Sequence, residues 1–152
     1  MPDSLLSFEH QDGLLTFPIE RALYYLSPEG KLSCSILCGT NDEFDYMAAP
    51  LFAAHGVSSG SAISVGQLLQ IPEKYEPSQG IELPRTHLYT GAHYSPWNTR
   101  LEIVSVGLAT LGIHASFVTP DPNYYDARAK DTCATFFAVF SQRPLSELWS
   151  PY

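Results

Sequence analysis

The chain has 152 residues, a length typical of one domain, and its apolar fraction of 45% is enough for a hydrophobic core. The formal net charge is −8, and residues 1–76 hold ten acids and three bases, so this half alone contributes −7. An acidic chain repels nucleic acid and anionic lipid, so we expect neither as a partner and expect a basic protein instead.

The amino-terminal segment and the cysteine content predict a cytoplasmic protein. Residues 1–13 contain neither a basic region nor a long apolar run, so they do not resemble a signal peptide. No segment approaches the roughly 20 apolar residues that a membrane-spanning helix needs. Three cysteines, an odd number, are typical of a reducing compartment rather than of a disulfide framework.

A first β-hairpin is predicted over residues 5–19. Asp12-Gly13 lies between its two apolar strands, and both residue types tolerate the positive φ of a tight turn. Pro18 is expected to end or border the second strand, because proline has no amide hydrogen to donate to a neighbouring strand.

A second hairpin is predicted over residues 21–38, with its turn at 27–30. Apolar and serine residues alternate in its second strand, so Cys34 and Cys38 share one face. Four strand positions separate their Cα atoms by about 13 Å, which is too far for a disulfide or a shared zinc ion. Both are therefore predicted to be reduced core residues, and Cys133 is interpreted in the same way.

The middle of the chain predicts the only helical structure before the carboxyl terminus. Residues 41–55 are rich in alanine, with Asn41 as a candidate cap and Pro50 inside the segment. They favour either two short helical turns or one short helix that begins near Pro50. One strand is then expected over residues 63–71.

The final third predicts mainly strands. Residues 101–106 and 113–118 read as two strands around a turn near residues 110–112. Residues 132–140 are apolar on both faces, which is typical of a central strand that is covered on both sides. Residues 144–149 are expected to add a terminal helical turn.

Together these elements predict a single domain over residues 1–152 of the mainly β class. We expect an antiparallel sandwich or a curled sheet with one or two short helices. The alternative is an α+β fold with one helix packed on an antiparallel sheet.

The segment Thr86–Trp97 contains two histidines, two tyrosines and a tryptophan, and is interpreted as a strand–turn–strand with an aromatic edge. His87 and His93 are six residues apart, a spacing that has no standard metal-binding geometry, and nothing selects a third ligand. We therefore expect no metal, and name these two histidines as the first ligands if one is bound.

Sequence motifs for catalysis are absent. The chain has no P-loop, no dinucleotide-binding glycine motif, no zinc-protease motif and no nucleophile elbow. We therefore assign no catalytic residue and expect no cofactor. A carboxylate pair that meets only in three dimensions remains an alternative.

Two segments combine acids with aromatic residues, which suits recognition of a basic protein surface. The alternative for residues 41–46 is a solvated loop or a helix start. The alternative for the loop at residues 119–131 is a cover over the end of a sheet. The candidate binding residues are Asp42, Glu43, Asp45, Tyr46, Tyr124, Tyr125 and Asp126.

The residues from Leu101 to Phe140 form a strand–strand–loop–strand pattern whose loop contains Tyr124-Tyr125-Asp126. This pattern resembles the carboxyl-terminal part of small bacterial β-rich immunity-type proteins, which are encoded beside secreted toxins and bind them. The resemblance covers about a quarter of the chain. It implies a non-catalytic protein that neutralises a toxin through a rigid complementary surface.

The rhythm of the last strands is also similar to the hotdog fold of thioesterases, in which a sheet wraps a long helix. Only residues 41–55 can supply that helix, and Pro50 interrupts them. This alternative implies a small acyl-group enzyme with Asp45, His55 or Glu73 near a thioester pocket.

Overall fold

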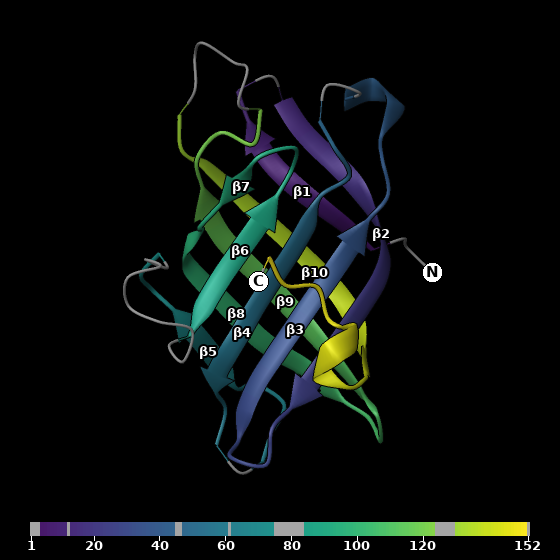
Figure 1. Ribbon diagram of the computed structural model, residues 1–152, viewed down its shortest axis with the longest axis vertical. Helices are drawn as coiled ribbons and strands as arrows, with labels where there is room; N and C mark the ends of the chain where they lie inside the picture. Colours follow the sequence, from purple (N-terminus) through teal and green to yellow (C-terminus); the bar gives the residue numbers. More distant parts are fainter. Residues whose placement is uncertain are drawn as a thin grey trace.

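The computed structural model of the protein describes residues 4–11, 13–44, 47–60, 62–74, 84–123 and 130–151. Ten β-strands within these ranges form one sheet in the order β5-β8-β9-β10-β1-β2-β3-β4-β6-β7 (Figure 1). The strands are β1 (Leu5–His10), β2 (Gly13–Leu26), β3 (Lys31–Cys38), β4 (Leu51–Ser58), β5 (Leu68–Ile71), β6 (Arg85–Tyr89), β7 (His93–Tyr94), β8 (Trp97–Val106), β9 (Thr110–Thr119) and β10 (Thr132–Gln142).

The fold is mainly β, as the sequence predicts. Its helical structure within the described ranges consists of two 3-10 turns, η1 (Asp42–Phe44) and η3 (Leu145–Glu147). The second of these confirms the predicted terminal helical turn. The described part of the chain holds no helix with the length and apolarity needed to cross a membrane.

The sheet curls so that its two halves face one another across the core (Figure 1). Phe52 on β4 stacks on Phe117 of β9, with ring centroids 4.7 Å apart and an interplanar angle of 16°. Phe136 on β10 meets the same Phe52 ring at 5.4 Å. Four strands separate β4 from β9 in the sheet order, so these contacts form only because the sheet curls. Aromatic side chains thus fill the space between the two halves.

The two amino-terminal hairpins share one long strand. β2 runs without interruption from Gly13 to Leu26, pairs with β1 through its first half and with β3 through its second, and has a bulge between Ile19 and Arg21. Pro18 therefore does not end the strand. It lacks an amide hydrogen, but its carbonyl accepts a hydrogen bond from the Gly39 amide at 2.8 Å.

The helix expected over residues 41–55 is wrong. Only Asp42–Phe44 form a 3-10 turn, and Leu51–Ser58 form β4. The reason lies in the burial of β4, because Phe52, Ala53, Ala54 and His55 are all buried. A strand that is covered on both faces loses the period-two pattern, so its alanines resemble a short helix.

The prediction that residues 132–140 are covered on both sides is also wrong. β10 is a central strand, but its residues alternate strictly between buried and exposed positions. Ala134, Phe136 and Ala138 face the core, whereas Phe137 and Val139 are about half exposed. Cys133 lies on the exposed face, so its predicted burial is a further error.

Two boundaries in the other strands differ from the predictions. The strand expected over residues 63–71 is formed by Leu68–Ile71 alone. The turn between β8 and β9 lies at residues 107–109, before the predicted position near 110–112. Both errors concern strand ends, which short side-chain patterns locate least well.

Thiol labelling tests the inward orientation of β3. Cys34 and Cys38 are buried, and desolvation raises the pKa of each thiol to about 12, so neither forms the reactive thiolate at neutral pH. We expect an aromatic disulfide reagent to modify one thiol of the native protein rapidly and the other two only on unfolding. Cys133→Ser should remove the rapid phase, and rapid modification of all three thiols would contradict the position of β3.

Candidate functional site

The acidic part of the predicted binding surface lies on η1. Asn41 holds this turn, because its Oδ1 accepts a hydrogen bond from the Glu43 amide at 3.0 Å and its Nδ2 donates to the Thr16 carbonyl at 2.7 Å. Asp42 and Glu43 are exposed and therefore present their charges to solvent. The predicted site residues that lie outside the described ranges are Asp45, Tyr46, Tyr124, Tyr125 and Asp126.

The aromatic segment around His87 and His93 forms the β6–β7 hairpin at one edge of the sheet, which confirms the strand–turn–strand prediction. Tyr89 pairs with His93, and their rings lie 4.8 Å apart. Within the described ranges, no three His, Cys, Asp or Glu residues are arranged to hold a metal ion. The metal prediction therefore stays a prediction.

His55 and His87 lie side by side on the outer face of β4 and β6, with ring centroids 6.5 Å apart. Burial lowers the pKa of His55 to about 4, helped by the nearby Arg85 and opposed by the Trp149 carbonyl. Burial also lowers the pKa of His87 to about 4, together with the positive charges of His55, Arg85 and His93. Both imidazoles are therefore neutral at pH 7.

The carboxyl-terminal segment covers the outer face of β3 and β4, and Figure 1 shows it in front of these two strands. Nε2 of His55 lies 3.0 Å from the Trp149 carbonyl, and the Trp149 amide donates to Oγ of Ser35 at 3.2 Å. Between this segment and the β2–β3 turn lies a groove of about 750 Å³, which we call the strap groove. His55 and Arg85 are among the residues that line it.

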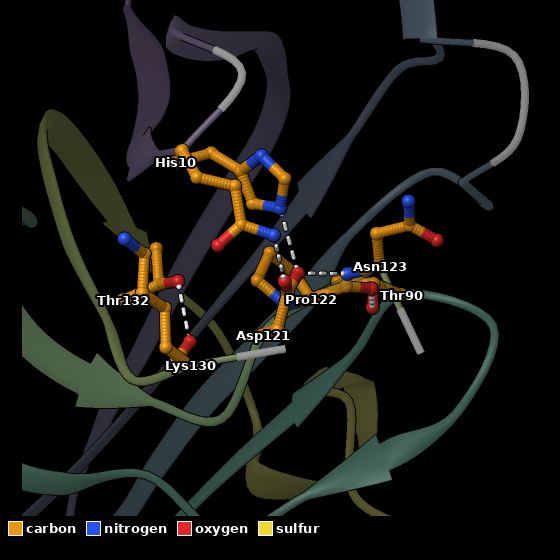
Figure 2. Close-up of polar contacts among 8 residues, drawn as sticks. His10, Thr90, Asp121, Pro122, Asn123, Lys130 and Thr132 are labelled. Carbon is orange, nitrogen blue, oxygen red and sulfur yellow. Dashed lines mark hydrogen bonds and ion pairs between the residues drawn. The ribbon is translucent and has the colours of Figure 1, made fainter. Parts of the chain in front are cut away.

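A buried polar network lies where β1 and β9 end (Figure 2). Nε2 of His10 is 2.7 Å from Oδ1 of Asp121, and their side chains are 0% and 1% exposed. The same carboxylate accepts hydrogen bonds from Nε2 of Gln11 at 2.9 Å and from the Asn123 amide at 2.8 Å. Asp121 thus joins the first hairpin to the segment that follows β9.

Figure 2 shows two further hydroxyl hydrogen bonds in this region. Thr90 donates to the Pro122 carbonyl at 2.8 Å, and Thr132 donates to the Lys130 carbonyl at 3.2 Å. Because the bonds made by Asp121 and Thr90 tie distant chain segments together, we assign the network a structural role.

The outer face of β8–β10 and β1 carries an exposed group of apolar side chains. Phe137 and Val139 lie on β10. Leu6 of β1 pairs with Phe136 of β10 in the antiparallel register, so the next residues outward, Leu5 and Phe137, lie side by side. Val104 lies in the β8 bulge nearby. We call these four residues the outer apolar patch: Leu5, Val104, Phe137 and Val139 are 41%, 43%, 44% and 52% exposed.

Comparisons of the chain with protein-family models, with curated proteins and with solved structures found no match.

The residues named for the thioesterase alternative are not brought together where the structure describes them. His55 is buried beneath the carboxyl-terminal segment, and Glu73 is exposed after β5. Asp45 lies outside the described ranges.

Sequence reasoning missed the strap groove and the outer apolar patch. The apolar residues of β10 are the available signal for the patch, but their pattern predicts burial on both faces. The groove had no comparable signal, because its walls come from segments that are far apart in the chain.

Proposed function

We propose that this chain is a non-catalytic protein-binding domain that engages a basic protein through the outer apolar patch. Following the immunity-type resemblance, we propose a secreted bacterial toxin as the class of partner. The observation that carries the proposal is the exposure of Phe137 and Val139 on a central strand of the sheet.

The chemistry of the patch favours a protein surface as its ligand. Large contiguous apolar patches are uncommon on the surfaces of monomeric proteins and mark places where another surface is buried. An aromatic residue among aliphatic neighbours is the usual composition of an interface centre, and Phe137 has this position between Leu5 and Val139.

Charge selects a basic partner over a second copy of the chain. Two copies, each with a net charge of −8, repel one another, whereas a basic protein is attracted. Glu102 on β8 pairs with His114 on β9, and His114 pairs with Phe137 on β10. The Glu102 carboxylate therefore lies in the same cross-strand row as Phe137. The exposed Asp42 and Glu43 add to the field that steers the partner.

We also propose that the protein works in the cytoplasm. The three free cysteines support this location, because thiols stay reduced there and an exposed one such as Cys133 is otherwise open to oxidation.

Site-specific photo-crosslinking in the native host tests the partner class. We expect a photoreactive phenylalanine analogue at position 137 to capture one basic protein, which mass spectrometry identifies. The matched control is the same analogue at Leu37, which is 43% exposed on β3 and three strands away. Capture of a second copy of the chain, of nothing, or of the same protein from position 37 would overturn the proposal.

Binding kinetics with that purified partner then test the roles of the residues. Phe137→Ser combined with Val139→Ser should raise the dissociation rate at least tenfold, because these changes remove interface burial. Replacing Asp42, Glu43 and Asp45 with Asn, Gln and Asn should slow association and flatten its salt dependence. Unchanged dissociation in the first variant would remove the outer apolar patch from the interface. Hydrolysis of acyl thioesters by the purified protein would contradict the non-catalytic role.

A further inference from the structure

A cavity of about 370 Å³, which we call the outer cavity, lies on the outer face of β8, β9, β10 and β1. Exposed residues of β8, β10 and β1 line it, among them Arg100, Thr135 and Glu9. Thr135 is two positions from Phe137 along β10, so the cavity adjoins the outer apolar patch.

A bulge in β8 forms one side of the outer cavity. Two residues of β8, Asn98 and Thr99, stand opposite Phe117 of β9. The φ of Asn98 is 51°, in the left-handed region that asparagine tolerates better than most residues. Its amide donates to the Pro72 carbonyl at 2.9 Å. Bulges bend a strand and recur beside functional sites, and all four of these residues line the cavity.

The outer cavity carries two opposite charges that are not neutralised. Arg100 and Glu9 are both exposed, and neither makes an ion pair with any residue that the structure describes. This holds for Glu102 as well, although it lies only two positions from Arg100 along β8. Both charges are therefore available to a ligand.

The strand registers fix the distance between the two charges. The cross-strand row that begins at Arg100 passes through Ser116 and Thr135 to Ser7 on β1, two positions from Glu9. Three strand spacings of about 4.8 Å and two rises of about 3.4 Å put the Cα atoms of Arg100 and Glu9 about 16 Å apart. The two side chains together reach about 11 Å, so they cannot pair with each other.

We propose that the outer cavity binds a short peptide of about three residues by its two free ends. Side chains stand roughly perpendicular to a sheet, so the charged groups of Arg100 and Glu9 lie at a similar separation to their Cα atoms. A hydrogen bond of about 3 Å at each end leaves about 10 Å, which is the length of three extended residues. The guanidinium of Arg100 then holds the terminal carboxylate, and the carboxylate of Glu9 holds the terminal ammonium.

The surface between the two charges favours a peptide over other zwitterions. Ser116 and Thr135 contribute hydroxyl groups to the cavity, and Gln70 and Asn98 contribute amide groups. All four side chains can donate and accept hydrogen bonds, which the amide and carbonyl groups of a peptide backbone require. The volume of about 370 Å³ lies within the range of about 300–1,000 Å³ for small-ligand sites.

An NMR titration with triglycine tests the proposal. N-acetyl-triglycine lacks the terminal ammonium, triglycinamide lacks the terminal carboxylate, and glycine carries both charges too close together. We expect saturable binding of triglycine, and at least threefold weaker binding of the other three ligands. Equal affinity for either blocked peptide or for glycine would overturn the two-ended recognition, as would the absence of saturation by triglycine.

Substitutions assign each charge to one end of the peptide. Arg100→Gln should weaken triglycine binding at least threefold and leave triglycinamide binding unchanged, whereas Glu9→Gln should weaken triglycine binding and leave N-acetyl-triglycine binding unchanged. Both side chains are exposed, so neither change is expected to disturb the fold. The matched control is Lys31→Gln, because Lys31 is an exposed cation on β3 that does not line the cavity. Unchanged triglycine affinity in either cavity variant, or an equal loss in the control, would overturn the proposal.

The Cys133 thiol reports where the peptide binds, because it is exposed and lines the same cavity. Saturating triglycine should slow its modification by the aromatic disulfide reagent at least threefold, and glycine at the same concentration should not. An unchanged labelling rate would place the peptide elsewhere on the protein and overturn the proposal.

Discussion

Replacing Asp121 with alanine is expected to lower the free energy of unfolding by about 3–5 kcal/mol. The side chain is 1% exposed, and its carboxylate accepts hydrogen bonds from His10, Gln11 and the Asn123 amide. Removing the acceptor leaves three donors in a buried site and breaks the link between β1 and the segment after β9. Since domains of this size are stable by about 5–15 kcal/mol, the loss is a large fraction of the total.

Urea unfolding monitored by tryptophan fluorescence measures this loss. Asp121→Asn should lie between wild type and the alanine variant, because the amide keeps one acceptor oxygen. The matched control is Asp42→Ala, which removes an exposed carboxylate and should change stability by less than about 0.5 kcal/mol. A loss below about 1 kcal/mol for Asp121→Ala would contradict the structural role of the network.

Acidification from pH 7 to pH 4 is expected to destabilise the fold through His55 and His87. Each has a pKa of about 4 in the folded protein and about 6.5 in the unfolded chain. Between these values the unfolded state binds more protons, so stability is fully present above about pH 6.5 and falls as the pH approaches 4. A displacement of this size corresponds to about 3 kcal/mol for each histidine.

Unfolding free energies at pH 7.5, 6.5, 5.5 and 4.5 test this dependence. The double variant His55→Gln, His87→Gln should lose less stability than wild type over this range, each protein being compared with its own value at pH 7.5. Parallel profiles for wild type and the double variant would show that these two histidines do not take up protons on unfolding.

Features that depend on neighbouring residues were predictable from the sequence. The alternation in Lys31–Cys38 placed Cys34 and Cys38 on one buried face, and the structure confirms it. The turn residues between β2 and β3 were also recognisable, and the Gly30 amide does donate to the Ser27 carbonyl. Both signals work because side-chain direction and turn geometry are set within a few residues.

Which faces become covered was not predictable in this way. β4 and β10 both lack a clear polar face in the sequence, yet β4 is buried on both sides and β10 on one. The difference arises because the carboxyl-terminal segment crosses the outside of β3 and β4, where Trp149 contacts His55. No segment of the described chain covers the outer face of β10 at Phe137.

The sequence by itself therefore determined the β class, the inward faces of individual strands and the acidic charge, since these follow from composition and period. Only the tertiary structure decided the rest. His10 meets Asp121 across 111 positions, and His55 meets Trp149 across 94. The strap groove and the uncovered patch depend on such distant contacts, because burial and pKa are set by whatever segment the curled sheet brings alongside.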